Sequence, residues 1–149
     1  MAEIPQDTAP TAGWMDGREH VLPVRIYYED TDFTGVVYHG NYLRYFERGR
    51  SDFLRLVGVG HSALLEKSAA FTVVKISLEF RKPARIDDAL LVRTTIDSTR
   101  GPRLTFHQTI WRAGEPICSA HVEAACIDMN GRPRKPAPEL IAALAPLID

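Results

Sequence analysis

YYEDTDFTGVVYHGNY, residues 27–42, changes character twice along its length. An apolar, strand-like start gives way to three carboxylates within residues 29–32, a turn at Gly35, and then His39 just before a helix start at Asn41. A helix N-terminus offers unpaired backbone N–H groups and a partial positive charge, which can bind a carbonyl oxygen. A carboxylate beside it can act as a base or a nucleophile. The stretch therefore predicts a site that acts on a carbonyl carbon.

Asp32 is the candidate catalytic residue, because it lies in the turn that leads to the helix N-terminus. On position alone, it could instead cap this turn through backbone hydrogen bonds. Asp30, Asp32 and His39 are metal ligands by type, but no further histidine or carboxylate is evident to complete a set, so we expect no metal. Gly35 is expected to allow a backbone conformation, or a close approach of substrate, that a side chain would block.

The residues from Asp30 to Tyr42 resemble the signature of the 4-hydroxybenzoyl-CoA thioesterase family, with the closest similarity to its Tol-Pal-associated acyl-CoA thioesterase branch. A looser similarity continues through Arg81–Asp88, and the resemblance covers most of the chain from Val21 to Met129. It implies an acyl-CoA thioesterase that hydrolyses a short-chain or aromatic acyl thioester to free acid and coenzyme A. Such a reaction needs no metal or redox cofactor.

The resemblance also implies roles for individual residues. Asp32 and His39 are the catalytic residues that it implies, with the backbone N–H of His39 and its neighbours, including Gly35 and Tyr38, facing the substrate carbonyl. Whether Asp32 activates water or attacks directly is left open. Glu47 is the second candidate, because other hotdog thioesterases place a catalytic carboxylate on the helix.

Two alternatives accompany these roles. The side chain of His39 could simply bond within the loop, and Glu47 could form an ion pair with Arg44 or Arg50. His39 and Asp32 could also supply the acid–base pair of a hotdog hydratase or dehydratase, although the order of the motif argues against it. A non-catalytic acyl-binding scaffold subunit, in lipid or envelope metabolism, is the alternative outside enzymes.

Hydrophobic periodicity predicts an α+β domain with one long helix, Asn41 to Val57, whose apolar stripe must pack on a sheet. Short connections favour an antiparallel meander for the strands after this helix. The resemblance implies a hotdog fold, an antiparallel five-stranded sheet wrapped around the helix. The predicted strands are Val21–Glu29, Phe71–Arg81, Ala89–Asp97, Leu104–Arg112 and Ile117–Met129. A short helix, Glu139–Leu147, is expected at the C-terminal end.

Residues 1–20 are expected to form a flexible N-terminal tail, and residues 21–149 a single domain. The formal net charge of −1 excludes an overall field that would recruit nucleic acid. Cys118 and Cys126 lie too far apart on one predicted strand for a disulfide, which is typical of a reducing cytoplasm. No signal peptide or transmembrane segment is evident.

The expected partners are an acyl-CoA substrate, or an acyl carrier protein as an alternative carrier, and further copies of this chain. Arg81, Lys82 and Arg85 form the basic cluster expected to bind the coenzyme A phosphates, with Arg100 and Arg103 next in order. Each cluster could equally be an ordinary charged surface. Open sheet edges predict a homo-oligomer, a dimer or a homotetramer.

Overall fold

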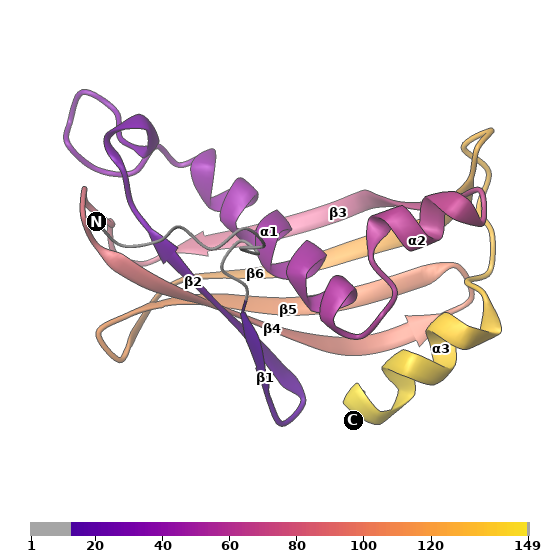
Figure 1. Cartoon of the computed structure of the whole chain (residues 1–149). Coiled ribbons are helices and arrows are strands. Elements are labelled where there is room, and N and C mark those ends of the chain that lie inside the picture. The colour runs from indigo at the N-terminus through magenta and orange to yellow at the C-terminus, as the bar shows by residue number, and fades with distance from the viewer. Residues whose placement is uncertain (1–12, 149) are drawn as a thin grey trace, which may run out of the picture.

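The computed structural model describes residues 13–148, which form one six-stranded antiparallel sheet with its helices (Figure 1). The order of the strands across the sheet is β1-β2-β4-β5-β6-β3. The strands are β1 (Trp14–Asp16), β2 (Glu19–Arg25), β3 (Ala69–Phe80), β4 (Ala89–Arg100), β5 (Arg103–Arg112) and β6 (Glu115–Asp128). The α-helices are α1 (Asn41–Leu56), α2 (His61–Glu66) and α3 (Pro138–Leu144), and the 3₁₀ turns are η1 (Tyr28–Asp30) and η2 (Ala145–Leu147).

Helix α1 lies against the sheet and buries the predicted apolar stripe. The buried residues of the stripe are Tyr42, Tyr45, Phe46, Gly49 and Phe53. Contacts between α1 and strands β2 and β4 fix its position, and Figure 1 shows α1 lying along the sheet with α2 beside β3. The predicted helix is confirmed almost to the residue. This agreement follows from the length and regularity of its three- and four-residue spacing.

Strands β4, β5 and β6 form the predicted antiparallel meander, but β3 does not join it in the expected order. Chain order would place β3 beside β4. Instead β3 pairs with β6 and forms an outer edge of the sheet. The connection from β3 to β4, residues 81–88, is longer than a tight hairpin turn. It takes the chain from the β3 edge across the sheet to β4, which pairs with β2. The expectation of short hairpin connections throughout was therefore wrong for this pair.

A sixth strand comes from the region expected to be a flexible tail. Residues 14–20 form β1 and the start of β2, a hairpin with Trp14 paired to Val21 and Gly17 at its turn. The tail prediction is wrong for these residues, because the hairpin extends the sheet and satisfies its backbone groups there. Residues 1–12 of the predicted tail lie outside the described residues.

Two predicted boundaries also moved. The strand expected to run to Glu29 ends at Arg25, and residues 28–30 turn into η1. The C-terminal helix is present as α3 and η2, with Leu140 and Leu144 in the core. Cys118 and Cys126 are both free and buried in β6, as predicted. Within residues 13–148, no helix is long and apolar enough to cross a membrane.

The outer edge of the sheet is unusually apolar. Val73 and Val74 of β3 are each 46% exposed, and Phe80 is 49% exposed. β3 has a partner strand on one side only, so half of its backbone groups have no ladder partner within the described sheet. An exposed apolar edge of this kind is a surface that proteins normally cover.

Candidate active site

The loop of residues 31–40, between η1 and α1, is folded tightly around Asp32. The Asp32 N–H donates to the Val36 carbonyl oxygen at 2.9 Å, and the Gly35 N–H donates to the Asp32 carbonyl oxygen at 3.0 Å. Gly35 has φ = +82°, a left-handed conformation that favours glycine. The expected conformational role of Gly35 is thereby confirmed, and its N–H is already used within the turn.

The carboxylate of Asp32 is exposed at the tip of this loop. Its Oδ1 accepts hydrogen bonds from the Thr34 N–H at 2.8 Å and from the Thr34 hydroxyl. These bonds with Thr34, first of all the hydroxyl bond, lower the pKa of Asp32, and the nearby His39 lowers it further. Asp32 is therefore ionised at neutral pH, which both a nucleophile and a general base require.

Asp30 has a different environment from Asp32, although the two are separated by a single residue. Asp30 is 7% exposed, and its carboxylate oxygens accept hydrogen bonds from the Tyr27 N–H at 2.7 Å and the Asn41 Nδ2 at 2.9 Å. Its backbone carbonyl also accepts from the Tyr38 N–H at 2.9 Å. Asp30 therefore ties η1 to the start of α1, and both of its oxygens are occupied by these bonds.

The start of α1 follows directly on the Asp32 loop. The N-cap is Gly40, and Asn41 is the first helical residue, with its side chain directed to Asp30. The N–H of Asn41 donates to the Tyr38 carbonyl at 2.9 Å, and that of Tyr42 to the His39 carbonyl at 3.4 Å. Within residues 13–148, the N–H groups of His39 and Gly40 make no hydrogen bond, so both are able to donate to a substrate oxygen.

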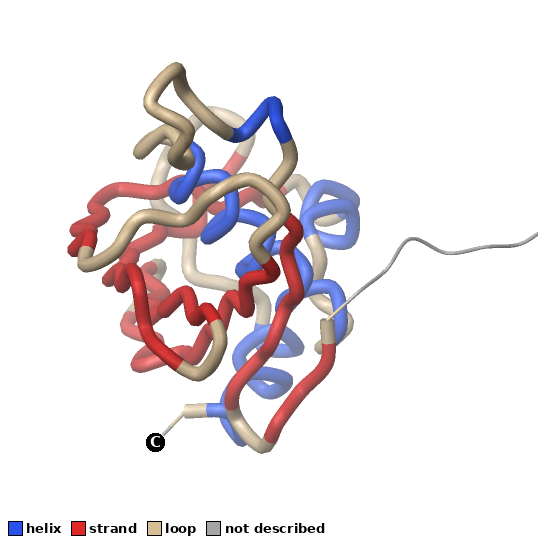
Figure 2. Tube along the Cα trace, turned by 90° about the vertical axis from the view of Figure 1, so that its left-hand side faces the viewer, coloured by secondary structure: helices blue, strands red, loops and turns tan. Residues whose placement is uncertain are grey.

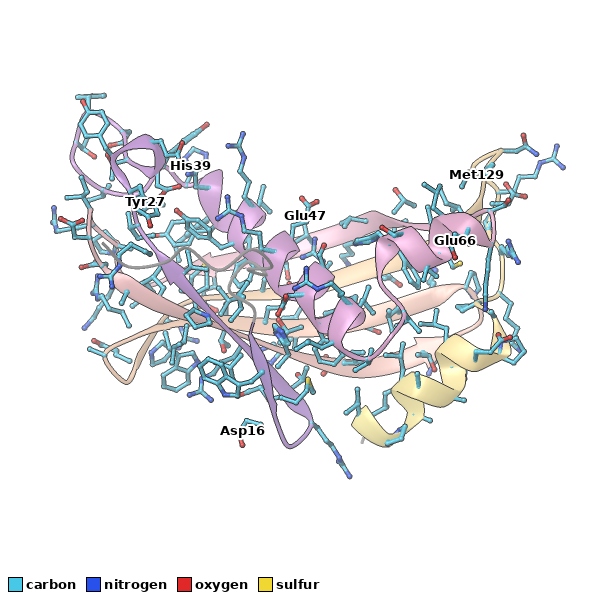
Figure 3. The ribbon with its side chains drawn as sticks, viewed as in Figure 1. Asp16, Tyr27, His39, Glu47, Glu66 and Met129 are labelled. Atoms are coloured by element: carbon cyan, nitrogen blue, oxygen red, sulfur yellow. The ribbon has the colours of Figure 1, made fainter. Side chains whose placement is uncertain are left out.

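The three residues expected around the substrate carbonyl therefore divide into two groups. The N–H groups of Gly35 and Tyr38 are used within the loop, and only that of His39 is available. The ring of His39 is exposed and stacks on that of Tyr38, with 4.5 Å between ring centroids. Figure 3 shows His39 at the same end of the molecule as Tyr27, with Glu47 further along α1.

The turn that carries the predicted basic cluster lies directly against the loop. The Val37 N–H donates to the Ala84 carbonyl at 2.9 Å, and Val36 forms a bridge with Arg85. Two members of the cluster form ion pairs. The Nε of Arg81 lies 3.6 Å from Oε1 of Glu79, and Lys82 is paired with Glu115.

Arg85 is the third member of that cluster. Its side chain is exposed and has no ion pair or hydrogen bond among the described residues. Of the three basic residues, Arg85 is therefore the one whose cationic group has no partner among the described residues and lies beside the Asp32 loop.

Glu47, the second carboxylate candidate, lies well along α1 and is exposed. The expected ion pair with Arg44 or Arg50 is absent from the described part of the chain. Glu47 and Arg50 instead line a cavity of about 250 Å³ between α1, α2 and β3. The Nη1 of Arg50 donates to Oε1 of the buried Gln108 at 2.9 Å, which holds the guanidinium at the side of this cavity.

Thr34 and Gly40 were not predicted to belong to the site, and Arg50 was considered only as an ion-pair partner of Glu47. The spacing Asp32-x-Thr34 is a signal for a side-chain-capped turn and could have identified Thr34. The free amide of Gly40 has no side-chain signal. The position of Arg50 depends on Gln108, 58 residues away, and no local pattern predicts that contact. Within residues 13–148, no three histidine, cysteine, aspartate or glutamate side chains are grouped to hold a metal ion.

Comparison with known proteins places these features in context. Residues 26–144 match the model of the thioesterase-like superfamily. The acyl-CoA thioester hydrolase YbgC of Escherichia coli is 43% identical over 114 residues, covering 75% of this chain and 85% of that protein. The acyl-CoA thioesterase YbgC of Haemophilus influenzae is 40% identical over 110 residues, covering 73% and 81%.

Solved structures show the same fold. A probable thioesterase from Bartonella henselae superposes with a TM-score of 0.77 at 39% identity, covering 80% of this chain and 99% of that one. A 4-hydroxybenzoyl-CoA thioesterase variant in complex with 4-hydroxybenzoyl-CoA superposes with a TM-score of 0.79 at 19% identity, covering 85% and 99%. The second likeness concerns the fold alone, and together the two establish the predicted hotdog architecture with one strand more than expected.

Proposed function

The chain belongs to the thioesterase-like superfamily, and we propose that it is an acyl-CoA thioesterase, which hydrolyses the thioester to a free acid and coenzyme A. The YbgC relatives carry the same activity in their names. The observation that carries the proposal is the loop itself: an exposed, ionised Asp32 lies before a helix start whose His39 and Gly40 amides are free.

In the mechanism that we propose, the thioester carbonyl oxygen accepts hydrogen bonds from the N–H groups of His39 and Gly40. Those donors, together with the positive end of the α1 dipole, stabilise the negative charge that develops on this oxygen. The carbon–sulfur bond then breaks, and coenzyme A leaves as the thiol after it takes up a proton. The ground-state carbonyl carries less charge, so the donors favour the transition state over the substrate.

Asp32 is the residue that we propose for the attack on the carbonyl carbon. It either removes a proton from the attacking water or attacks the carbonyl carbon itself, giving a mixed anhydride that water then hydrolyses. Both routes end in the same products and need an ionised, accessible carboxylate. Label found in Asp32 after a single turnover in ¹⁸O-labelled water would show the anhydride route, because the general-base route places the label only in the free acid.

The acyl group that we propose is short or aromatic. The cavity bounded by Leu54, Phe71 and Phe106 has a volume of about 250 Å³, which suits a small acyl group better than a long chain. It lies along α1 from the loop: from Asn41 to Arg50 the helix rises by about 14 Å. A short acyl group bound at Asp32 does not reach the cavity of the same copy, so the cavity can hold it only if a second copy brings its own cavity to this loop.

A second copy is the partner that we propose for the exposed edge of β3. Val73 lines the cavity and also lies on this edge, so pairing there would cover both. A dimer is the smallest assembly that achieves this, and a homotetramer is the larger alternative. The coenzyme A phosphates are assigned to the basic cluster, with Arg85 as its free member.

An acyl carrier protein, which presents an acyl group on the same pantetheine arm, is the alternative carrier to be tested beside coenzyme A. The cytoplasm is the location that we propose, since both cysteines are free thiols. The hydratase alternative loses support, because the ring of His39 stacks on Tyr38 and forms no hydrogen bond with Asp32. Asp32 and His39 are therefore not joined as the acid–base pair that was considered for a hydratase.

The direct test is thiol release from a panel of acyl-CoAs by the wild type and an Asp32→Asn variant. We expect the variant to lose at least about a hundredfold in kcat with an unchanged circular dichroism spectrum, since a required base or nucleophile is removed. Glu47→Gln serves as the matched control and should retain activity. Near-wild-type turnover by a folded Asp32→Asn protein, with loss in Glu47→Gln, would transfer the catalytic role to Glu47.

A further inference from the structure

Two histidines lie side by side on the face of the sheet opposite α1. His107 of β5 and His121 of β6 are directly paired in the strand register. Their rings stack with 4.7 Å between centroids and 29° between ring planes. Alternate residues of β5, including Phe106 and Gln108, are buried toward α1, so His107 faces the other way. Figure 2 views the molecule from the side, with the helices and the strands in different colours.

The surroundings of this pair leave both imidazoles free. Neither ring has a hydrogen bond or ion pair among residues 13–148. The register neighbours on either side are Thr95 and Ser77, whose short side chains do not cover the rings. The nearest carboxylate on the same face of β6, Glu123, is engaged by Arg103 at 3.0 Å.

Two imidazole rings on adjacent strands offer two nitrogen ligands that can bind one metal ion together. Imidazole nitrogen is a favoured ligand of zinc, nickel and copper, with metal–nitrogen distances of about 2.0–2.1 Å. Two such nitrogens bound to one ion are roughly 3 Å apart in tetrahedral geometry. The rings can reach this spacing by rotation about their side-chain bonds, because His121 is exposed and His107 is half-exposed.

We propose that His107 and His121 form a two-histidine binding site for a divalent late transition metal such as Zn²⁺ or Ni²⁺. Water completes the coordination of the ion, since two protein ligands leave positions open. An ion held across β5 and β6 cross-links neighbouring strands of the native sheet. It therefore binds the folded state in preference to the unfolded chain and raises the melting temperature.

This site is independent of the thioesterase loop. His107 and His121 lie on one face of the sheet, whereas α1, whose N-terminus adjoins Asp32, packs on the other. Metal binding should therefore persist in the Asp32→Asn variant. Failure of the catalytic proposal would leave the metal site untouched, and the reverse also holds.

The experiment uses the full-length chain with a tag free of histidine, treated with chelator and then freed of it. Titration calorimetry and thermal melting are run with Zn²⁺ and Ni²⁺, and with Mg²⁺ as a control that prefers oxygen ligands. His107→Gln and His121→Gln each remove one ligand from an accessible side chain. His61→Gln is the matched control, because His61 is exposed on α2 and bonded only to Ser51 within the described chain.

We expect saturable binding of Zn²⁺ and Ni²⁺ by the wild type and a rise in Tm of about 5 °C at a metal concentration a hundred times the dissociation constant. His107→Gln and His121→Gln should each lower the metal affinity at least about tenfold. Even the loss of a residue that only hydrogen-bonds to a metal ligand lowers metal affinity by about 10–100-fold. His61→Gln should bind as the wild type does. Equal affinity in all three variants, or a Tm unaffected by metal, would show that the rings only stack and would overturn the proposal.

Discussion

Two carboxylates only one residue apart take opposite roles in the loop before α1. Asp30 is buried and both of its oxygens accept hydrogen bonds from the protein, whereas Asp32 is exposed and is bonded only by Thr34 within the described chain. A group that is fully engaged by its own fold cannot attack a substrate without breaking those bonds. Position along the chain alone does not separate the two residues, since both precede the same helix. Their hydrogen-bond partners do.

The free cation of Arg85 leads to a prediction about substrate binding. Arg85→Ala should raise KM for an acyl-CoA by about ten- to a hundredfold, since a charge-assisted phosphate contact contributes roughly 1.5–3 kcal/mol. The same acyl group on a short pantetheine thioester lacks the nucleotide phosphates, so its KM should hardly change. Lys82→Ala is the matched control, because Lys82 is already paired with Glu115. Equal losses on both substrates would mean that Arg85 supports the loop and not the phosphates.

His20 and Asp52 form a buried pair that predicts a pH dependence of stability. His20 of β2 is fully buried, and its Nε2 lies 2.7 Å from Oδ2 of Asp52 on α1. The same Oδ2 accepts the Gly13 N–H at 2.8 Å. Burial lowers the pKa of His20 below its ordinary value of 6.5, and it outweighs the opposite effect of Asp52. The Nδ1 of His20 has no hydrogen-bond partner among residues 13–148, so protonation there would bury an unsatisfied donor.

The sign follows from proton linkage. Below about pH 6.5 the unfolded chain binds a proton at His20 that the folded chain resists. The contribution of neutral His20 is therefore complete above pH 6.5 and is lost as the pH falls toward its folded pKa. Urea unfolding at pH 7.5 and 5.5 should show a steeper fall in stability for the wild type than for His20→Gln. Parallel curves for the two proteins would exclude His20 as the source.

At the scale of the elements, hydrophobic periodicity predicted the helices and strands whose formation depends on neighbouring residues in the sequence. Helix α1 was predicted closely because its apolar residues recur every three or four positions for four turns. The position of β3 could not be predicted in this way. Its pairing with β6 joins residues such as Phe80 and Cys118, far apart in the chain, and nothing in either strand's own pattern specifies the partner. The β1–β2 hairpin was missed because residues 14–20 are short and mixed in polarity.

The close approach of α1 to the sheet leads to a prediction about Gly49. A Cβ at this position would lie 3.0 Å from Val92 and 3.2 Å from Nε2 of Gln108, and both of these residues are fully buried. Alanine favours the helix by about 1 kcal/mol over glycine, but overpacking a buried contact costs about 1–3 kcal/mol. Gly49→Ala should therefore destabilise the protein, as measured by urea unfolding.

A double-mutant cycle tests the cause. Shortening the opposing side chain in Val92→Ala should reduce the cost of Gly49→Ala, because the crowded atom is then absent. If Gly49→Ala costs the same in both backgrounds, the contact with Val92 is not what limits the position. Gly49 would then be required for another neighbour, of which Oγ1 of the buried Thr94, at 3.1 Å from the added Cβ, is the nearest alternative.

At the scale of the whole molecule, a single copy of the chain leaves one sheet edge uncovered and keeps its small cavity apart from the Asp32 loop. Exposed apolar side chains of β3 face outward, Val73 lines the small cavity beside them, and the Asp32 loop lies before the N-terminus of α1. The sequence indicated open edges but could not show which edge is apolar, because that depends on the order of strands in the sheet. Once β3 is known to be an outer strand, its exposed valines become the natural place for a second copy.

The β3 edge therefore carries the last prediction. Light scattering of the wild type at micromolar concentration should give at least twice the chain mass of 16.7 kDa. The double variant Val73→Lys/Val74→Lys places two charges on the edge, which proteins use to block strand pairing, so its mass should fall toward that of one chain. If the cavity of one copy works with the loop of another, thioesterase activity should fall with the mass.

A control pair with the same charge change away from this edge, Thr95→Lys/Thr109→Lys on the outer faces of β4 and β5, should remain assembled if β3 is the interface. An assembled but inactive β3 variant would instead place Val73 in acyl binding within a single copy, and an unchanged, active β3 variant would exclude this edge from the assembly.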